Sequence, residues 1–242
     1  CDNDLLRRDR PSIWSKYGPN VALTLGDWLI ALAFELAAEA GQRAQTPLLV
    51  KILAQHMATT TAGEASEFSL EKALEWERYI EIASDKTAPL LTAPLEGVAA
   101  MALHVDASSS IGTYFRSLGA AYQIANDIMN FRALDGAIDK GSDLARRAPN
   151  AVVVLYRQSL KADQLKKFDE WYSARSNTEF ANWRQKILSS EAMALSAHQM
   201  QKGLSKTAHF AKEMPMALSD AILPVELLLR QVCLKAISPV NS

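Results

Sequence analysis

Apolar residues at helical spacing run through most of the chain, and this pattern restricts its fold more than any other feature. The stretch VALTLGDWLIALAFELAAEA, residues 21–40, is apolar nearly all round, which is typical of a helix buried among other helices. Further helices are predicted from an N-cap at Ser69 and at about 88–104, 108–133, 149–159, 162–174, 177–201 and 216–236. Strand signals are scarce, so the sequence predicts an all-α bundle of long antiparallel helices.

The chain also looks like one domain. Its 242 residues, 49% of them hydrophobic, can bury a sizeable core. No repeat, flexible linker or break in composition divides it. We therefore expect residues 1–242 to form a single all-α domain, and because the chain starts at Cys1 we expect it to be N-terminally incomplete.

Composition excludes several classes of function. Lys and Arg total 26 against 27 Asp and Glu, so no overall charge indicates nucleic-acid binding. The two cysteines lie at opposite ends, which argues against a disulfide framework or a zinc site and favours the cytoplasm. No apolar run reaches the roughly 18 to 20 residues that span a bilayer, so we expect no stable membrane insertion.

The first polar cluster is DNDLLRRDRP, near the start of the chain. On a helix, Asp4 would pair with Arg7 or Arg8, giving an ion-paired, solvated face. Alternatively, adjacent arginines bind phosphate oxygens in a bidentate fashion while nearby carboxylates hold Mg²⁺ against the same phosphates. The residues alone leave both interpretations open.

The second cluster is SDKTAPLL, which places Lys86 and Thr87 inside an otherwise apolar segment. The lysine could extend along the surface to reach water. If it points into the bundle instead, it needs an anionic partner, and a bound diphosphate would supply one.

The third cluster is YQIANDIMNFRALDGAIDKGSDLARR. Gln123, Asn126, Asp127 and Asn130 lie near one another on a predicted helix, and Lys140 follows. Buried polar groups of this kind destabilise a fold by several kcal/mol unless they find partners. The spacing suits a metal site on a helix, but amides occupy two of the three positions where acids are expected.

Five motifs in this order resemble those of the trans-isoprenyl diphosphate synthases, the family that makes farnesyl, geranylgeranyl and longer polyprenyl diphosphates. RRDRPSIWSKYGPNVALTLGDWLIALAFELAAE resembles RRGxPxxHxxxGxxxAxxxGDxLxxxAFxxLA, and GEASEF is similar to GQxxDL. YIEIASDKTAPLLTAPLEGVA resembles YxxxxxxKTaxLxxxxxxxGA, SLGAAYQIANDIMN resembles LGxAFQIxDDxxD, and KGSDLARRAPNAVV resembles GxDLxxGKxTLP. The resemblance covers roughly residues 1–155.

The resemblance implies a helical bundle around a central cavity, usually in a homodimer, that transfers a prenyl group. In that family two aspartate motifs hold Mg²⁺ on an allylic diphosphate, which ionises and is attacked by the double bond of isopentenyl diphosphate. By matching positions, the implied metal-site residues are Asp2, Asn126, Asp127 and Asn130, with Asp127 also catalytic. The implied substrate-binding residues are Arg7, Lys86 and Thr87 for the allylic diphosphate, Arg8 for isopentenyl diphosphate, Gln123 beside the reacting carbons, and Lys140 as a looser match; Lys86 and Gln123 are also implied in catalysis.

The departures from the family pattern keep three hypotheses open. Asn126 and Asn130 remove two charges from the second aspartate motif, and Arg147 with Ala148 replaces a later Gly-Lys pair. The leading hypothesis is a Mg²⁺-dependent prenyltransferase that makes a linear polyprenyl diphosphate. The others are a catalytically impaired homologue that acts as a partner subunit or isoprenoid-diphosphate binder, and a terpene cyclase or a prenyltransferase with an unusual acceptor.

Overall fold

The computed structural model describes residues 5–7, 10–68, 75–132, 134, 141–175 and 178–238. Asp2, Arg8, Ser69 and Lys140 lie outside these ranges. The two strands are β1 (Leu6–Arg7) and β2 (Arg10–Pro11). The helices are α1 (Ile13–Tyr17), α2 (Pro19–Arg43), α3 (Leu48–Phe68), α4 (Trp76–Met101), the 3₁₀ turn η1 (Val105–Ala107), α5 (Ser108–Arg132), α6 (Ser142–Arg146), α7 (Ala151–Ser159), α8 (Ala162–Ser173), α9 (Phe180–Leu188), α10 (Ala192–Ala211) and α11 (Met216–Ile237).

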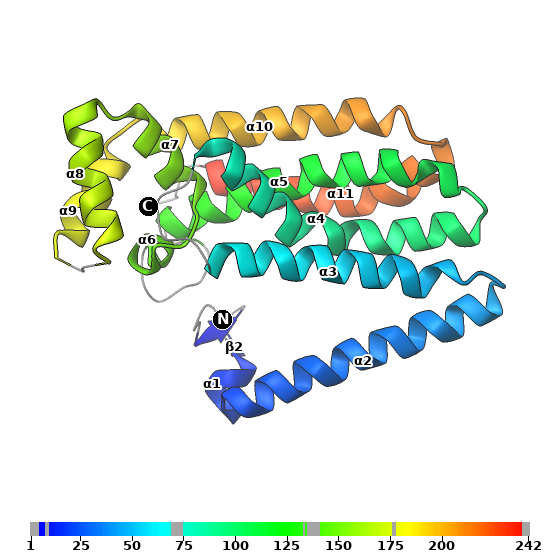
Figure 1. Ribbon diagram of the computed structural model, residues 1–242. Helices are drawn as coiled ribbons and strands as arrows, with labels where there is room; N and C mark the ends of the chain where they lie inside the picture. The colour runs from blue at the N-terminus through cyan, green and yellow to red at the C-terminus, as the bar shows by residue number, and fades with distance from the viewer. Residues whose placement is uncertain are drawn as a thin grey trace.

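The predicted all-α bundle is confirmed. Helix α5 lies at its centre, with α4, α10 and α11 packed around it and α3 packed against α4 (Figure 1). The short helices α6 to α9 gather at one end of these long helices, where α5 ends and α4 begins (Figure 1). Fully buried side chains on several of these helices form one core, including those of Tyr79, Tyr114, Phe131, Phe168 and Met200.

Two glycines let the long helices approach closely. A Cβ added to Gly63 of α3 would lie 2.9 Å from backbone atoms of Asp85 and Lys86 on α4. A Cβ added to Gly119 of α5 would lie 3.1 Å from the backbone nitrogen of Ala88. Both contacts are closer than side chains normally allow, so residues 85–88 of α4 are held tightly between α3 and α5.

Helix boundaries differ from the predictions in two places. The predicted helices from Ser69 and at 88–104 are, within the described residues, the single helix α4, which contains Pro89 and Pro94. Each proline removes one backbone hydrogen bond, but packing between α3 and α5 keeps the helix continuous. The helix predicted at 177–201 is instead two helices, α9 and α10, separated by residues 189–191.

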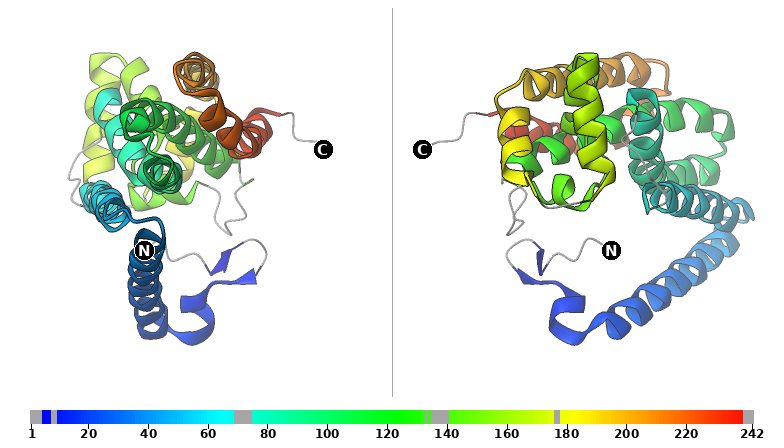
Figure 2. Two further views of the ribbon diagram at one scale, coloured as in Figure 1. Left: turned by 90° about the vertical axis from the view of Figure 1, so that its right-hand side faces the viewer. Right: turned by 60° about the vertical axis from the view of Figure 1, so that its left-hand side comes forward.

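The prediction that residues 21–40 are buried among other helices is wrong for this chain. Helix α2 contacts α3 near the turn that joins them and diverges from it toward its N-terminal end (Figures 1 and 2). Gly41 is its only buried residue, and Leu23 and Trp28 are 69% and 59% exposed. By length and composition α2 could also cross a membrane, which contradicts the prediction that no apolar run is long enough.

Arg7 and Arg10 lie in short strands and not in a helix. Leu6 and Arg7 pair with Pro11 and Arg10 as a short antiparallel ribbon. The residue before a proline favours extended backbone, which explains why a strand forms where the charge pattern suggested a helix. Arg7 therefore lies in a strand and not on the helix that its predicted pairing with Asp4 required. Asp4 itself lies outside the described residues.

Candidate active site

Asp127 is the centre of a buried hydrogen-bond network between three helices. Its side chain is on α5 and the residue is only 1% exposed. The Tyr79 hydroxyl on α4 donates to Asp127 Oδ2 at 2.7 Å, and the Ala151 backbone N–H donates to the same oxygen at 2.6 Å. Gln123 Nε2, one turn earlier on α5, donates to Oδ1 at 3.0 Å. These bonds hold α4, α5 and the start of α7 together.

Burial dominates the electrostatics of this network. It raises the pKa of Asp127 to about 8, and the nearby charge of Asp143 acts in the same direction. The hydrogen bonds from Tyr79, Ala151 and Gln123 oppose the shift because they favour the carboxylate. The pKa of Tyr79 lies well above its ordinary value, chiefly because the hydroxyl is buried and also because it faces Asp127.

The first residues of α7 complete the network. Asn150 is the N-cap of α7, and its Oδ1 accepts the Val152 backbone N–H at 3.0 Å. Asn150 Nδ2 donates to Asp143 Oδ2 at 3.0 Å. Asp127 therefore lies at a capped helix N-terminus, where unpaired backbone N–H groups and the helix dipole favour a negative charge.

The two asparagines of the second motif differ in their surroundings. Asn130 is 6% exposed; its Nδ2 donates to Ser142 Oγ at 2.9 Å, and its Oδ1 accepts the Asp143 backbone N–H at 3.4 Å. Asn126, one turn earlier, is half-buried. The Asn130 contacts use the amide as both donor and acceptor, which a carboxylate could not do, so they suit the residue present.

The described residues of this motif do not fit a magnesium site. Both Asp127 carboxylate oxygens already accept hydrogen bonds, and the Asn130 oxygen accepts a backbone N–H. Among the described residues, no group of three or more His, Cys, Asp or Glu side chains could hold a metal ion. Mg²⁺ prefers several oxygen ligands that include carboxylates. Asp127 as a metal ligand therefore stays a prediction, and the structure gives its side chain a second role in joining helices.

Lys86 has two carboxylate partners within the protein. It lies on α4, two turns after Tyr79 and so on the same face of the helix. Its Nζ forms ion pairs with Glu67 and, at 3.2 Å, with Glu64 Oε2, both on α3. Burial lowers the pKa of Lys86, but the hydrogen bonds and charges of Glu67 and Glu64 outweigh it and the pKa is raised. The anionic partner that this lysine needs is thus already present.

The structure therefore brings some predicted residues together and leaves others apart. Lys86 and Thr87 lie on α4, while Gln123, Asn126, Asp127 and Asn130 lie on the neighbouring α5. Arg7 lies in β1. Asp2, Arg8 and Lys140 fall outside the described residues, so their predicted roles stay predictions.

Sequence reasoning missed four members of the site: Glu64, Glu67, Tyr79 and Asn150. A signal for each of them was present. Glu64 and Glu67 stand three residues apart in GEASEF, and Asn150 directly precedes the apolar helix 151–159, as an N-cap does. Tyr79 could have been found from its seven-residue separation from Lys86, which places both side chains on one face of a helix.

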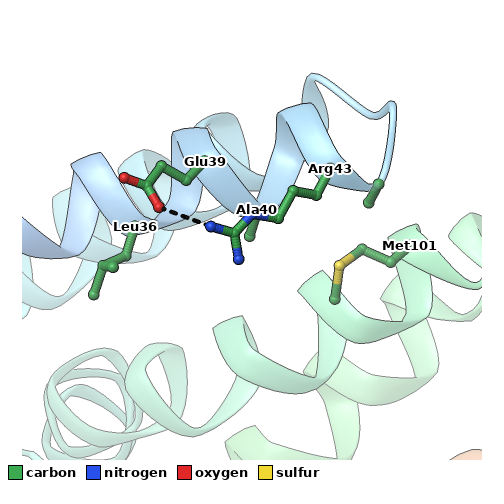
Figure 3. A pocket seen from close by; sticks show the side chains of 6 residues that line it. Leu36, Glu39, Ala40, Arg43 and Met101 are labelled. Carbon is green, nitrogen blue, oxygen red and sulfur yellow. Dashed lines mark hydrogen bonds and ion pairs between the residues drawn. The ribbon is translucent and has the colours of Figure 1, made fainter.

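The described residues also form surface hollows away from this network. One of about 510 Å³ lies between the last turns of α2 and Met101 of α4, with Leu36, Glu39 and Arg43 around it (Figure 3). Glu39 and Arg43 form an exposed ion pair there (Figure 3). The lining is mostly apolar and includes none of the predicted site residues.

Comparison with known proteins shows to which family the chain belongs. The sequence profile described as polyprenyl synthetase matches residues 1–189. The chain belongs to the polyprenyl synthetase family. The match includes all the motifs quoted above and extends beyond residue 155, to which the motif resemblance reached.

Individual relatives agree with this assignment. The chain is 27% identical over 173 residues to a short chain isoprenyl diphosphate synthase of Methanocaldococcus jannaschii, covering 70% of this chain and 53% of that protein. It is 30% identical over 171 residues to a probable farnesyl diphosphate synthase of Bradyrhizobium diazoefficiens, covering 66% and 52%. The chain thus spans about half the length of these curated relatives.

Solved structures confirm the fold. A polyprenyl synthase from Caulobacter crescentus, crystallised with calcium and isoprenyl diphosphate, matches with a TM-score of 0.77 and 22% identity. That alignment covers 98% of this chain and 72% of the other. The heptaprenyl diphosphate synthase of Staphylococcus aureus matches with a TM-score of 0.76, 19% identity and coverage of 96% and 72%. At these identities the likeness establishes the all-α isoprenoid synthase fold.

Proposed function

We propose that this protein is a prenyltransferase that condenses an allylic diphosphate with isopentenyl diphosphate to give a longer linear polyprenyl diphosphate. The observation that carries the proposal is the pairing of two family motifs on adjacent helices: Lys86 on α4 and the Gln123–Asn130 segment on α5. Family membership and relatives named as farnesyl, geranylgeranyl and nonaprenyl diphosphate synthases support the same reaction.

In this proposal the protein binds the diphosphate and positions the hydrocarbon. Lys86 and Thr87 on α4, with Arg7, contact the allylic diphosphate, and Arg8 and Lys140 are further diphosphate ligands. Gln123 lies beside the reacting carbons, where its Asp127 hydrogen bond fixes the orientation of its side chain. The bond between the allylic carbon and the diphosphate oxygen breaks, the double bond of isopentenyl diphosphate attacks that carbon, and a proton is lost.

Mg²⁺ is the cofactor that we propose, with Asp2 as a ligand, and its role would be to stabilise the charge on the departing diphosphate. A neighbour in the fold comparison was crystallised with calcium and isoprenyl diphosphate, which supports a divalent cation in this family. In the second motif Asp127 stays a proposed ligand, whereas Asn126 and Asn130 offer only amide oxygens, so we expect weaker binding of Mg²⁺ than an all-acid motif would give.

We also propose a cytoplasmic homodimer. The exposed apolar side chains of α2 support this because a large apolar patch on a protein surface marks an interaction site. A second copy would bury Leu23, Trp28 and their neighbours, and the helix would then be buried among helices as its sequence suggests.

A second candidate is a catalytically impaired homologue that binds isoprenoid diphosphates or acts as a partner subunit. The specific observation that favours it is the commitment of Asp127 and Asn130 to hydrogen bonds within the protein. In this candidate the second motif joins helices and no longer assists chemistry.

One experiment separates the two candidates. The protein is incubated with Mg²⁺, labelled isopentenyl diphosphate and, in turn, dimethylallyl, geranyl and farnesyl diphosphates, and the extracted products are identified by mass. A linear elongated product that disappears in Lys86→Ala supports the prenyltransferase. Diphosphate binding without turnover refutes it and supports the second candidate, and a cyclic or alcohol product would favour a cyclase. Asn126→Asp, which restores one acid, should raise turnover in the prenyltransferase.

A further inference from the structure

Lys86 is the centre of an ion-pair cluster with two carboxylates of α3. Its single positive charge faces the carboxylates of Glu64 and Glu67. These two residues are one helical turn apart on α3, so both side chains reach the same lysine. The cluster thus places two carboxylates on one ammonium group.

The cluster is built into the helix packing. Gly63 directly precedes Glu64. At Gly63, α3 lies so close to α4 that an added Cβ would be 2.9 Å from backbone atoms of Asp85 and Lys86. A larger residue at position 63 would separate the helices and carry Glu64 and Glu67 away from the lysine. The close approach therefore fixes the ion pairs independently of any ligand.

The charges have a consequence for an incoming anion. Lys86 is 21% exposed and Glu64 is 35% exposed, so a ligand that reaches the lysine also meets the Glu64 carboxylate. A free diphosphate must displace at least one carboxylate from the ammonium group and then remain close to it, where like charges repel. A neutral side chain at position 64, such as the Gln of the GQxxDL motif, would leave only one carboxylate on the lysine.

We propose that Glu64 is a specificity-determining residue that disfavours free diphosphate at Lys86. The proposal rests on the proposed function, because it takes Lys86 as a diphosphate ligand. A diphosphate that carries a bound divalent cation has less negative charge for Glu64 to repel, so Glu64 disfavours it less than it disfavours free diphosphate. Glu67, only 13% exposed, is the more buried partner of Lys86, and Glu64, at 35%, sets the affinity.

The test measures binding, not turnover. Inorganic diphosphate is titrated by calorimetry into the wild type and Glu64→Gln, first in EDTA and then with Mg²⁺. Glu39→Gln is the matched control, because it neutralises an exposed glutamate whose ion-pair partner, Arg43, also lies on α2. In EDTA we expect Glu64→Gln to bind diphosphate at least about tenfold more tightly than the wild type, whereas Glu39→Gln should bind as the wild type does. With Mg²⁺ the difference should shrink.

A double variant shows whether the effect passes through Lys86. Adding Lys86→Ala to Glu64→Gln should remove the gain in affinity, because no ammonium group is left to release. The inference is overturned if Glu64→Gln leaves the affinity in EDTA unchanged, or if the double variant keeps the gain. Absence of prenyl products in every variant, together with a Lys86-dependent gain, would refute the proposed reaction and leave this inference standing.

Discussion

The buried carboxyl group of Asp127 makes the stability of the protein depend on pH. The pKa is about 8 in the folded protein and near 3.8 in an exposed aspartate, so between these values the folded state binds a proton that the unfolded state has lost. Stability therefore falls as pH rises from about 4 to 8. One pKa unit corresponds to about 1.4 kcal/mol, so the full window is worth on the order of 5 kcal/mol if Asp127 alone carries it.

Asp127→Asn tests this reasoning because it keeps the shape and removes the titration. The amide oxygen can replace Oδ2 and accept from both Tyr79 and Ala151, while the amide nitrogen faces Gln123, whose side-chain oxygen can turn to accept from it. At pH 5 we expect the variant to unfold within about 1 kcal/mol of the wild type. By pH 8 the variant should be the more stable protein, by several kcal/mol.

Asp127→Ala should behave differently, because it removes the acceptor altogether. Tyr79 and Ala151 are both at most 1% exposed, so their hydroxyl and N–H groups would be buried without a partner. Each such group destabilises by about 1–3 kcal/mol, which predicts a loss of roughly 3–5 kcal/mol relative to the wild type at pH 5. The difference should shrink toward pH 8, because only the wild type carries the titrating carboxyl group. Gln123 is half-buried and can find water instead.

Urea denaturation followed by circular dichroism at pH 5, 6, 7 and 8 measures all three proteins. Asp27→Asn removes an exposed carboxylate on α2 and reports the effect of a charge change outside the network. A constant difference between wild type and Asp127→Asn across this range would contradict the argument. It would mean that the three hydrogen-bond donors and the α7 N-terminus keep the carboxylate ionised throughout.

Three further outcomes are expected. Gly63→Ala should destabilise the protein by about 1–3 kcal/mol, because its Cβ meets backbone atoms that cannot move aside. Gly26→Ala is the control: its Cβ meets nothing within 4 Å, so it should be neutral or stabilising when the two are compared by thermal denaturation. Arg147→Lys should lose about 1–2 kcal/mol in the same assay, because it gives up the guanidinium stacking 3.9 Å from the Trp171 ring and bonds to two carbonyls; an unchanged Tm would contradict this. Trp28→Glu should shift the protein toward monomer in light scattering, and an unaltered dimer would place the interface elsewhere.

The helices could be predicted where local signals and packing agree. The predicted 108–133 became α5 at Ser108–Arg132, because apolar periodicity and polar flanks mark both of its ends. Helix α4 was divided wrongly because Pro89 and Pro94 are local signals for a break. Contacts with α3 and α5, made by residues distant in the sequence, offset that preference, and no local pattern reports them.

The candidate site was predictable as a set of polar residues but not as a set of contacts. Asp127 was singled out because a buried acid needs partners, yet its shortest bond is to the backbone N–H of Ala151, which carries no sequence signal of its own. Lys86 was expected to need an anion, but its ion pairs come from α3, 19 and 22 residues earlier in the chain. Residue types indicate that a partner is required, while the packing of helices decides which partner is present.

The pattern of substitution in the second motif follows from these contacts. Of the three positions that are acidic in the family, the chain keeps an acid only at Asp127, which is the one that joins three helices. At position 130 an amide makes contacts that need both a donor and an acceptor, so a change back to Asp would leave Ser142 or the Asp143 N–H facing a poorer partner. Asn126 is half-buried and does not make those contacts, so it is the position where an acid can be restored with the least disturbance to the fold. Selection for stability alone would tolerate both asparagines and would accept an amide at position 127 as well. The turnover of Asn126→Asp relative to the wild type therefore measures how much the chemistry still depends on this motif.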